Sequence, residues 1–157
     1  MTKLLLTLGL ALVLMGCQSQ AAQNDAPQAA EPEVEYLNPP GAEGRPFTEA
    51  VRVGNMLYLS GKLGTIPGQG LAEGGIQPET RQTMENIKDA LERYGSSMDR
   101  VVKCTVFLAD IAEWGAMNEV YVTFFPTNRP ARSALGSSGL AINARVEIEC
   151  IATVSSS

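Results

Sequence analysis

The 157-residue sequence contains no histidine and only three cysteines. Without histidine, the usual Ser-His and Cys-His nucleophile pairs are excluded. Three cysteines, one of them Cys17 near the N-terminus, leave no credible zinc site. Basic clusters are also lacking and the formal net charge is −5, which argues against nucleic acid as a partner. We therefore expect no metal and no cofactor. Chemistry would have to rest on a carboxylate, a hydroxyl, an arginine or the backbone.

Long hydrophobic runs are scarce as well. After Lys3, the apolar run of residues 4–15 is too short to cross a bilayer as a mature helix, and it is typical of a secretory signal. The run ends Leu-Met-Gly-Cys at residues 14–17, which resembles the lipobox of bacterial lipoproteins, in which the position of Cys17 is lipidated. A plain signal peptide, or an anchoring helix with an incidental cysteine, is the alternative interpretation.

The composition divides the chain into three parts. We expect a signal peptide at 1–16, a lipidated Cys17 with a flexible tether at 17–45, and a folded domain at 46–157. Such a protein would be held at the cell envelope through its N-terminal lipid. Gln18 in place of an aspartate favours the periplasmic face of the outer membrane if the cell is Gram-negative.

The other two cysteines, Cys104 and Cys150, lie in strand-like apolar runs. Cysteines in such runs are most often small buried hydrophobic residues. A disulfide between them would require neighbouring strands and a specific geometry, which the sequence leaves open.

Hydrophobic periodicity predicts the elements of the domain. A helix is expected from Pro78 to Tyr94, and a second helix begins at Asp110, ends before Pro126 and buries a stripe that starts at Trp114. A glycine-rich surface loop is expected at 64–75, and strands are expected at 49–53, 56–60, 101–109, 130–136 and 145–154. The predicted fold class is therefore α/β (α+β): a mixed sheet with two helices packed on one face.

Two charged residues, Arg132 and Glu147, stand inside segments whose other residues favour buried strand. Charge at such positions is unfavourable unless it is paired or used. Arg132 has the planar fork that suits a carboxylate, and Glu147 could orient a water or move a proton. The structural alternatives are an inter-subunit salt bridge for Arg132, and for Glu147 an ion pair with Arg132 or Arg145.

Several segments resemble the Rid/YjgF family of reactive-intermediate deaminases. The resemblance covers roughly residues 46–154 and rests on residues 54–61, 81–87, 102–110, 130–133 and 146–152. It implies a chorismate-mutase-like homotrimer with ligand pockets in the clefts between subunits. It also implies hydrolysis of enamines and imines, such as 2-aminoacrylate, to 2-keto acids and ammonia.

The resemblance also implies roles for individual residues. Arg132 falls on the arginine that binds the substrate carboxylate, Glu147 on the glutamate that helps to position water, and Ser60 on a serine that lines the pocket. Phe47 stands where the archetypes have a tyrosine, and Ala134 where they usually have a cysteine. The alternative function is a non-catalytic module that binds a small carboxylate, or a scaffold on the envelope.

Overall fold

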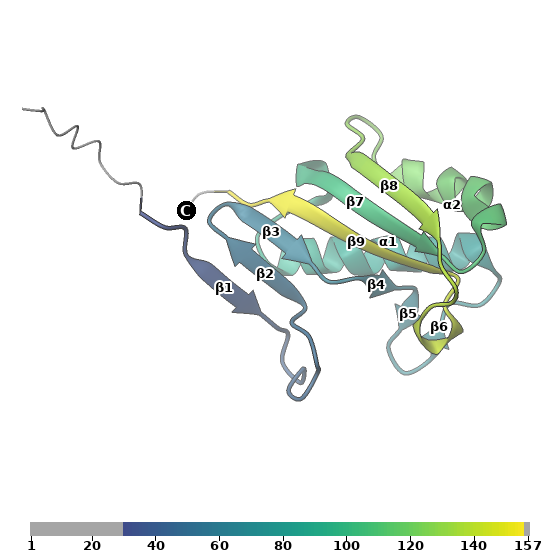
Figure 1. Ribbon diagram of the computed structural model, residues 1–157, viewed down its shortest axis with the longest axis horizontal. Coiled ribbons are helices and arrows are strands. Elements are labelled where there is room, and N and C mark those ends of the chain that lie inside the picture. The colour runs from purple at the N-terminus through teal and green to yellow at the C-terminus, as the bar shows by residue number, and fades with distance from the viewer. Residues whose placement is uncertain (1–29, 156–157) are drawn as a thin grey trace, which may run out of the picture. The chain divides into compact units, whose positions relative to one another are not determined.

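A computed structural model describes residues 30–155 of the chain. Its main feature is a seven-stranded sheet in the order β1-β2-β3-β9-β7-β8, with β4 pairing with β9 beyond the end of β3 (Figure 1). Among the strands of the described residues, only β7 and β8 run parallel to each other. The strands are β1 (Val34–Leu37), β2 (Ala50–Val53), β3 (Met56–Leu59), β4 (Lys62–Leu63), β7 (Val101–Leu108), β8 (Ala131–Gly136) and β9 (Val146–Thr153).

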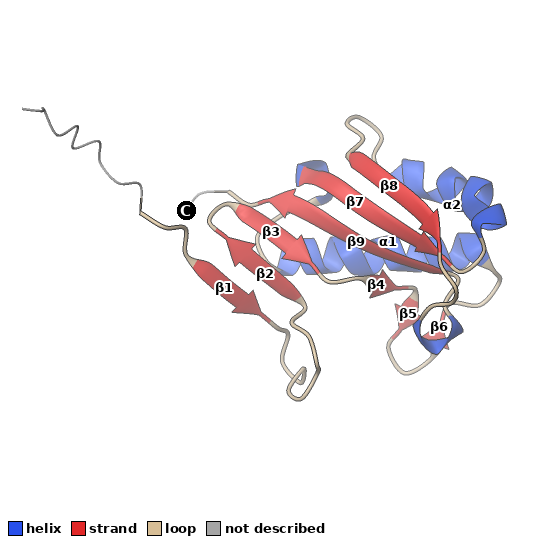
Figure 2. Ribbon diagram, in the orientation of Figure 1, coloured by secondary structure: helices blue, strands red, loops and turns tan. Residues whose placement is uncertain are grey.

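Within residues 30–155 the two α-helices, α1 (Ile76–Arg93) and α2 (Trp114–Tyr121), lie on the same face of this sheet (Figure 2). The predicted mixed sheet with two helices on one face is thus confirmed. Helix α1 buries Thr80, Met84, Ile87 and Leu91, as the apolar spacing predicts. It begins two residues before Pro78. Gly95 follows its C-terminal end with a φ of 79°, a left-handed conformation that ends helices and that residues other than glycine adopt less readily.

The core lies between the sheet and the helices, and β9 shows how strand alternation builds it. Val146, Ile148, Cys150 and Ala152 are buried, whereas Glu147 and its alternate neighbours point to the other, open face. Cys150 lies directly opposite Cys104 of β7, and the two cysteines form a disulfide. The question that the sequence leaves open is therefore answered by the strand register.

The fold begins earlier than the predicted boundary at residue 46. Strand β1 pairs antiparallel with β2, from Val34 opposite Val53 to Leu37 opposite Ala50. The prediction of a flexible tether is therefore wrong from residue 34 onward. The sequence does not reveal this strand, because four residues flanked by polar residues are too few to be told apart from a linker. The predicted signal peptide and the lipidated Cys17 lie outside the described residues.

Two further segments differ from expectation. The glycine-rich segment contains a small hairpin of β5 (Thr65–Ile66) and β6 (Gly70–Leu71). The second helix is short and flanked by 3-10 turns at Ile111–Glu113 and Val122–Phe124, with Asp110 capping the first turn through Ala112 N. Trp114, predicted to lie in the core or at an interface, is 43% exposed in the single chain because it begins the α-helix at the end of the core.

Two more 3-10 turns, Met98–Arg100 and Ala141–Asn143, connect the remaining elements. None of the helices formed by residues 30–155 is both long and apolar enough to cross a membrane.

Candidate ligand-binding site

Arg132 projects from β8 onto helix α2. Its partner in the parallel register is the buried Cys104, so its side chain lies on the helix-covered face. The guanidinium carbon lies 4.7 Å from the ring centre of Tyr121 and 5.6 Å from that of Trp114, and Nη1 donates a 2.6 Å hydrogen bond to Asn118 Oδ1. Residues 114, 118 and 121 share one face of α2, which forms a cradle for the arginine.

No carboxylate balances the charge of this arginine within residues 30–155. Its hydrogen-bond partner Asn118 is neutral, and the two aromatic rings contribute only their π faces. Burial raises the pKa of Tyr121 to about 12, although the charge of Arg132 acts in the opposite direction, so Tyr121 stays neutral. The guanidinium therefore keeps donors available for an anionic ligand.

Glu147 lies on the open face of the sheet. It stands opposite Leu63 of β4 and Phe107 of β7, and neither a hydrogen bond nor an ion pair engages its carboxylate within residues 30–155. It is therefore paired with neither Arg132 nor Arg145. The side chain packs directly against Gly61, where a β-carbon would overlap its Oε1.

Ser60 and Gly61 form a break between β3 and β4. Four residue steps from Tyr58 to Lys62 face only three steps on β9, which is the pattern of a β-bulge. Ser60 Oγ donates a 2.6 Å hydrogen bond to the carbonyl oxygen of Thr48. Phe47, the next residue toward the N-terminus, is 56% exposed. This hydrogen bond holds the backbone next to Phe47 beside the bulge, where Gly61 contacts Glu147.

The predicted site residues thus fall into two groups, which we call the arginine half and the glutamate half. The arginine half comprises Arg132 with its α2 cradle and Ala134, which is half-buried against the core on β8. The glutamate half comprises Phe47, Ser60, Gly61 and Glu147. Since Arg132 and Glu147 lie on opposite faces of the sheet, with β7 between their strands, a single chain does not enclose both in one pocket.

Sequence reasoning missed Asn118 and Gly61. Asn118 is a polar residue one helical turn after Trp114, in a stripe whose other residues are apolar. A polar residue at such a position is the one signal in the sequence that could have indicated a functional role. Gly61 could be recognised only from the close approach of Glu147 to its backbone.

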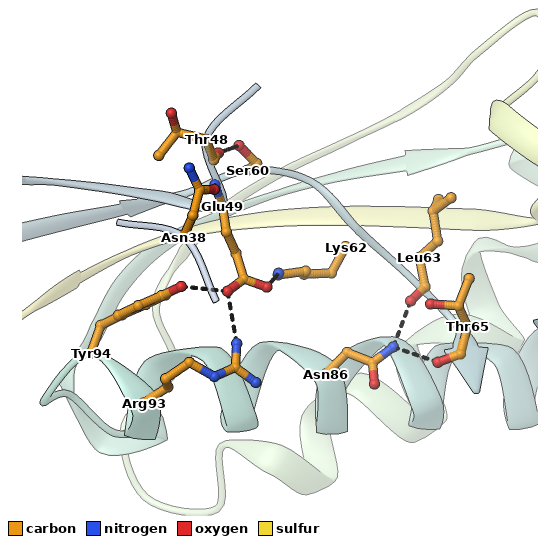
Figure 3. A network of polar contacts seen from close by, with 10 residues as sticks. All are labelled: Asn38, Thr48, Glu49, Ser60, Lys62, Leu63, Thr65, Asn86, Arg93 and Tyr94. Carbon is orange, nitrogen blue, oxygen red and sulfur yellow. Dashed lines mark hydrogen bonds and ion pairs between the residues drawn. The ribbon is translucent and has the colours of Figure 1, made fainter. Parts of the chain in front are cut away.

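A buried carboxylate, Glu49, lies beside Ser60 of the glutamate half and contacts Lys62, Arg93 and Tyr94 (Figure 3). Part of this cluster lines a cavity of about 430 Å³ between α1 and the β4–β5 segment. The lining includes Arg45, Glu49, Gly61, Lys62, Asn86 and Arg93, and it includes neither Arg132 nor Glu147.

Comparisons of the sequence with known proteins all point to the same family. The profile of the family described as endoribonuclease L-PSP matches residues 36–154. The chain is 40% identical over 116 residues to reactive intermediate deaminase A of Arabidopsis thaliana, covering 73% of this chain and 62% of that longer one, which is less than two thirds of its length. It is 40% identical over 114 residues to human 2-iminobutanoate/2-iminopropanoate deaminase, covering 72% of this chain and 82% of the human one.

Solved structures agree with these relatives. The Escherichia coli YjgF gene product has a TM-score of 0.67 and 33% identity, over 74% of this chain and 93% of its own. E. coli TdcF, solved with bound serine, has a TM-score of 0.67 and 32% identity, over 71% of this chain and 90% of its own. The chain therefore belongs to the endoribonuclease L-PSP family, the Rid/YjgF family that its motifs resemble.

Proposed function

We propose that the protein hydrolyses small imino acids and their enamine tautomers, of the 2-iminopropanoate and 2-aminoacrylate type, to 2-keto acids and ammonia. One observation carries the proposal: Arg132 has free guanidinium donors and no carboxylate partner within residues 30–155. Relatives about 40% identical are named 2-iminobutanoate/2-iminopropanoate deaminases. TdcF was solved with bound serine, a small amino acid whose carboxylate corresponds to that of the imino acids. An RNA substrate is disfavoured by the net charge of −5.

The chemistry follows from the two halves of the site. The substrate carboxylate binds the guanidinium of Arg132, and an enamine first takes a proton on carbon, which gives the protonated imine, the iminium ion. A water held by Glu147 then attacks the iminium carbon, forming a C–O bond while the π electrons of C=N move to nitrogen. Glu147 takes the proton that the water loses and passes it to this nitrogen. Collapse of this carbinolamine forms C=O, breaks the C–N bond and releases ammonia. The protein forms no covalent bond to the substrate.

The active assembly in this proposal is a homotrimer, in which the arginine half of one chain meets the glutamate half of its neighbour. The support is the position of the two halves on opposite faces of the sheet, together with membership of a family of small homotrimers. The open face also carries large exposed apolar side chains, as expected of a subunit interface: Val34, Tyr36, Tyr58 and Leu135.

Phe47 affects which substrates this site accepts. A phenyl ring offers no hydroxyl, so the polar contacts in the glutamate half fall to Ser60, Glu147 and the backbone. Because the ring is 56% exposed in one chain, it is free to contact a ligand side chain as an apolar wall. This arrangement favours imino acids with small apolar side chains, such as those derived from alanine and 2-aminobutanoate.

The test is ammonia release by the full-length chain, purified in detergent, while an L-amino acid oxidase generates 2-iminopropanoate from alanine. We expect release faster than in buffer, and a loss of about 100-fold or more in Arg132→Ala because the carboxylate clamp is removed. Arg129→Ala is the matched control, since Arg129 is an exposed arginine three residues away. No acceleration by the wild type, or full activity in Arg132→Ala, would refute the proposal.

We further propose that the chain is exported and lipidated at Cys17. The support is the apolar run before Cys17, and a Cys104–Cys150 disulfide that suits an oxidising compartment. Cells fed labelled palmitate should label the wild type but not Cys17→Ser. Equal labelling of the two proteins, or none in either, would contradict lipidation at this cysteine.

A further inference from the structure

Glu49 is a carboxylate buried inside a domain whose other acids are mostly at the surface. It is 7% exposed, and three side chains donate hydrogen bonds to it. Lys62 Nζ lies 2.5 Å from Oε1, Arg93 Nη1 lies 2.7 Å from Oε2, and Tyr94 Oη lies 2.5 Å from the same Oε2 (Figure 3). The two cations come from different elements: Lys62 belongs to β4, and Arg93 belongs to the last turn of α1.

The carboxylate is a fixed anion rather than a proton carrier. Burial acts to raise the pKa of Glu49, but the hydrogen bonds from Lys62 and Tyr94 and the charges of Lys62 and Arg93 outweigh it and lower the pKa. Burial and the hydrogen bond to Glu49 raise the pKa of Tyr94 to about 12, so the phenol stays protonated and remains a donor. A buried anion with two cations and a neutral donor is a rigid junction, because removing a donor leaves the buried carboxylate incompletely satisfied.

This junction is attached to the glutamate half through the backbone. The amide of Ser60 donates a 3.0 Å hydrogen bond to the carbonyl oxygen of Glu49, and Ser60 Oγ bonds to Thr48, the residue before it. Lys62 follows Gly61 directly, so the ion pair with Glu49 restrains the far side of the bulge. Gly61 is the residue against which Glu147 packs.

Helix α1 holds the next part of the same segment. Asn86 Nδ2 donates to the carbonyl oxygens of Leu63 and Thr65, at 2.8 and 2.9 Å. On the other side, the amide of Glu49 is held by Asn38 Oδ1 at 2.9 Å. The bulge is thus restrained along its length, and Glu49 is the point where α1, β4 and the start of β2 meet (Figure 3).

We propose that Glu49 is a positioning residue for the hydrolysis proposed above: with Lys62, Arg93 and Tyr94 it fixes the Ser60–Gly61 bulge, and through Gly61 it fixes the carboxylate of Glu147. Glu49 itself does not touch the substrate. The inference rests on the proposed function for its catalytic consequence, whereas the restraint on the bulge is a property of the fold alone.

The first test separates turnover from binding. Glu49→Gln keeps the size of the side chain but loses its attraction for two cations, so the bulge loosens and Glu147 is misplaced. We expect turnover of 2-iminopropanoate to fall about tenfold, because small misplacements of catalytic groups have effects of this order or larger. The affinity for 2-oxobutanoate, a stable carboxylate bound by Arg132 in the other half, should change less than twofold. Tyr94→Phe, which removes one hydrogen bond and no charge, should lower turnover by a smaller factor.

The second test needs no activity. Amide hydrogen exchange of residues 60–63 should be faster in Glu49→Gln than in the wild type, while exchange in β7 and β9 stays the same. Glu35→Gln is the matched control, because it breaks the Glu35–Arg52 ion pair on β1 and β2 and should alter neither exchange at the bulge nor turnover.

These outcomes are decisive in either direction. Unchanged exchange at 60–63 in folded Glu49→Gln and Tyr94→Phe would overturn the proposal, as would turnover within twofold of the wild type. A parallel loss of turnover and 2-oxobutanoate binding, matched by a lower melting temperature, would show that Glu49 only stabilises the fold. If the wild type itself has no turnover, the proposed function fails, and the exchange data alone decide whether Glu49 positions the bulge.

Discussion

Gly61 and Glu147 are in contact so close that a β-carbon at residue 61 would overlap Oε1 of Glu147 and lie 2.8 Å from its Cδ. Gly61→Ala must therefore displace the carboxylate, which is half-buried and can move outward. We expect turnover to fall about 10- to 100-fold with little change in melting temperature. Gly115→Ala is the control, because no heavy atom outside its own helical turn lies within 4 Å of the added β-carbon, and alanine favours helix by up to about 1 kcal/mol. Normal turnover in Gly61→Ala would show that the position of Glu147 does not matter.

Asn118 sets the orientation of Arg132 through a neutral hydrogen bond. Asn118→Ala should weaken 2-oxobutanoate binding about fivefold, the effect of losing one ordinary hydrogen bond of about 1 kcal/mol. Asn118→Asp should weaken it more, because the new carboxylate competes with the ligand for the guanidinium. Calorimetry with both variants measures this order. Equal affinity in Asn118→Asp and the wild type would mean that Arg132 is not the carboxylate clamp.

The Cys104–Cys150 disulfide connects β7 and β9 across 46 residues of chain. Closing a loop of that length in the unfolded state stabilises a fold by about 2 to 4 kcal/mol. Denaturant unfolding of Cys104→Ala/Cys150→Ala should therefore show a free energy of unfolding that is lower than that of the wild type by about this amount. Adding reductant should lower the free energy of unfolding of the wild type and leave that of the double variant unchanged. If the wild type and the double variant unfold alike without reductant, the two thiols are not bonded in the native protein.

Ionisation of Glu49 makes the free energy of unfolding depend on pH. Its folded-state pKa lies below the ordinary value of 4.5, so its ionic contacts contribute fully above that value and are lost as the pH falls through the folded-state pKa. The free energy of unfolding should be higher in the wild type than in Glu49→Gln at pH 7. This difference should shrink as the pH falls below about 4.5. A difference that is constant between pH 7 and pH 3 would contradict an ionised Glu49.

The success of the sequence-based prediction follows the length of each periodic segment. Helix α1 and strands β7 and β9 run for 18, 8 and 8 residues, long enough for one buried face to stand out. Strand β1 has only four residues and lies in the segment that composition predicts to be a tether, because its pairing with β2 leaves no local sign in its own sequence. Trp114 fitted the helical spacing but begins a helix of only eight residues, where the core ends.

The site was predictable residue by residue but not as an arrangement. Strand alternation places Glu147 opposite to the buried face of β9, which the sequence alone predicts. The face occupied by Arg132 depends on the parallel register that sets it beside Cys104, and the sequence contains no local sign of that register. The relation between the two charges, on opposite faces of one sheet, could therefore come only from the structure.

In the proposed trimer, a working site combines Arg132 of one chain with Glu147 of another. Full-length Arg132→Ala and Glu147→Gln, each inactive alone, are mixed, unfolded and refolded together, and imine hydrolysis is measured. Random trimers should recover about a quarter of the wild-type activity, because about one interface in four joins an intact arginine half to an intact glutamate half. If both residues act within one chain, the mixture will be as inactive as its two parents.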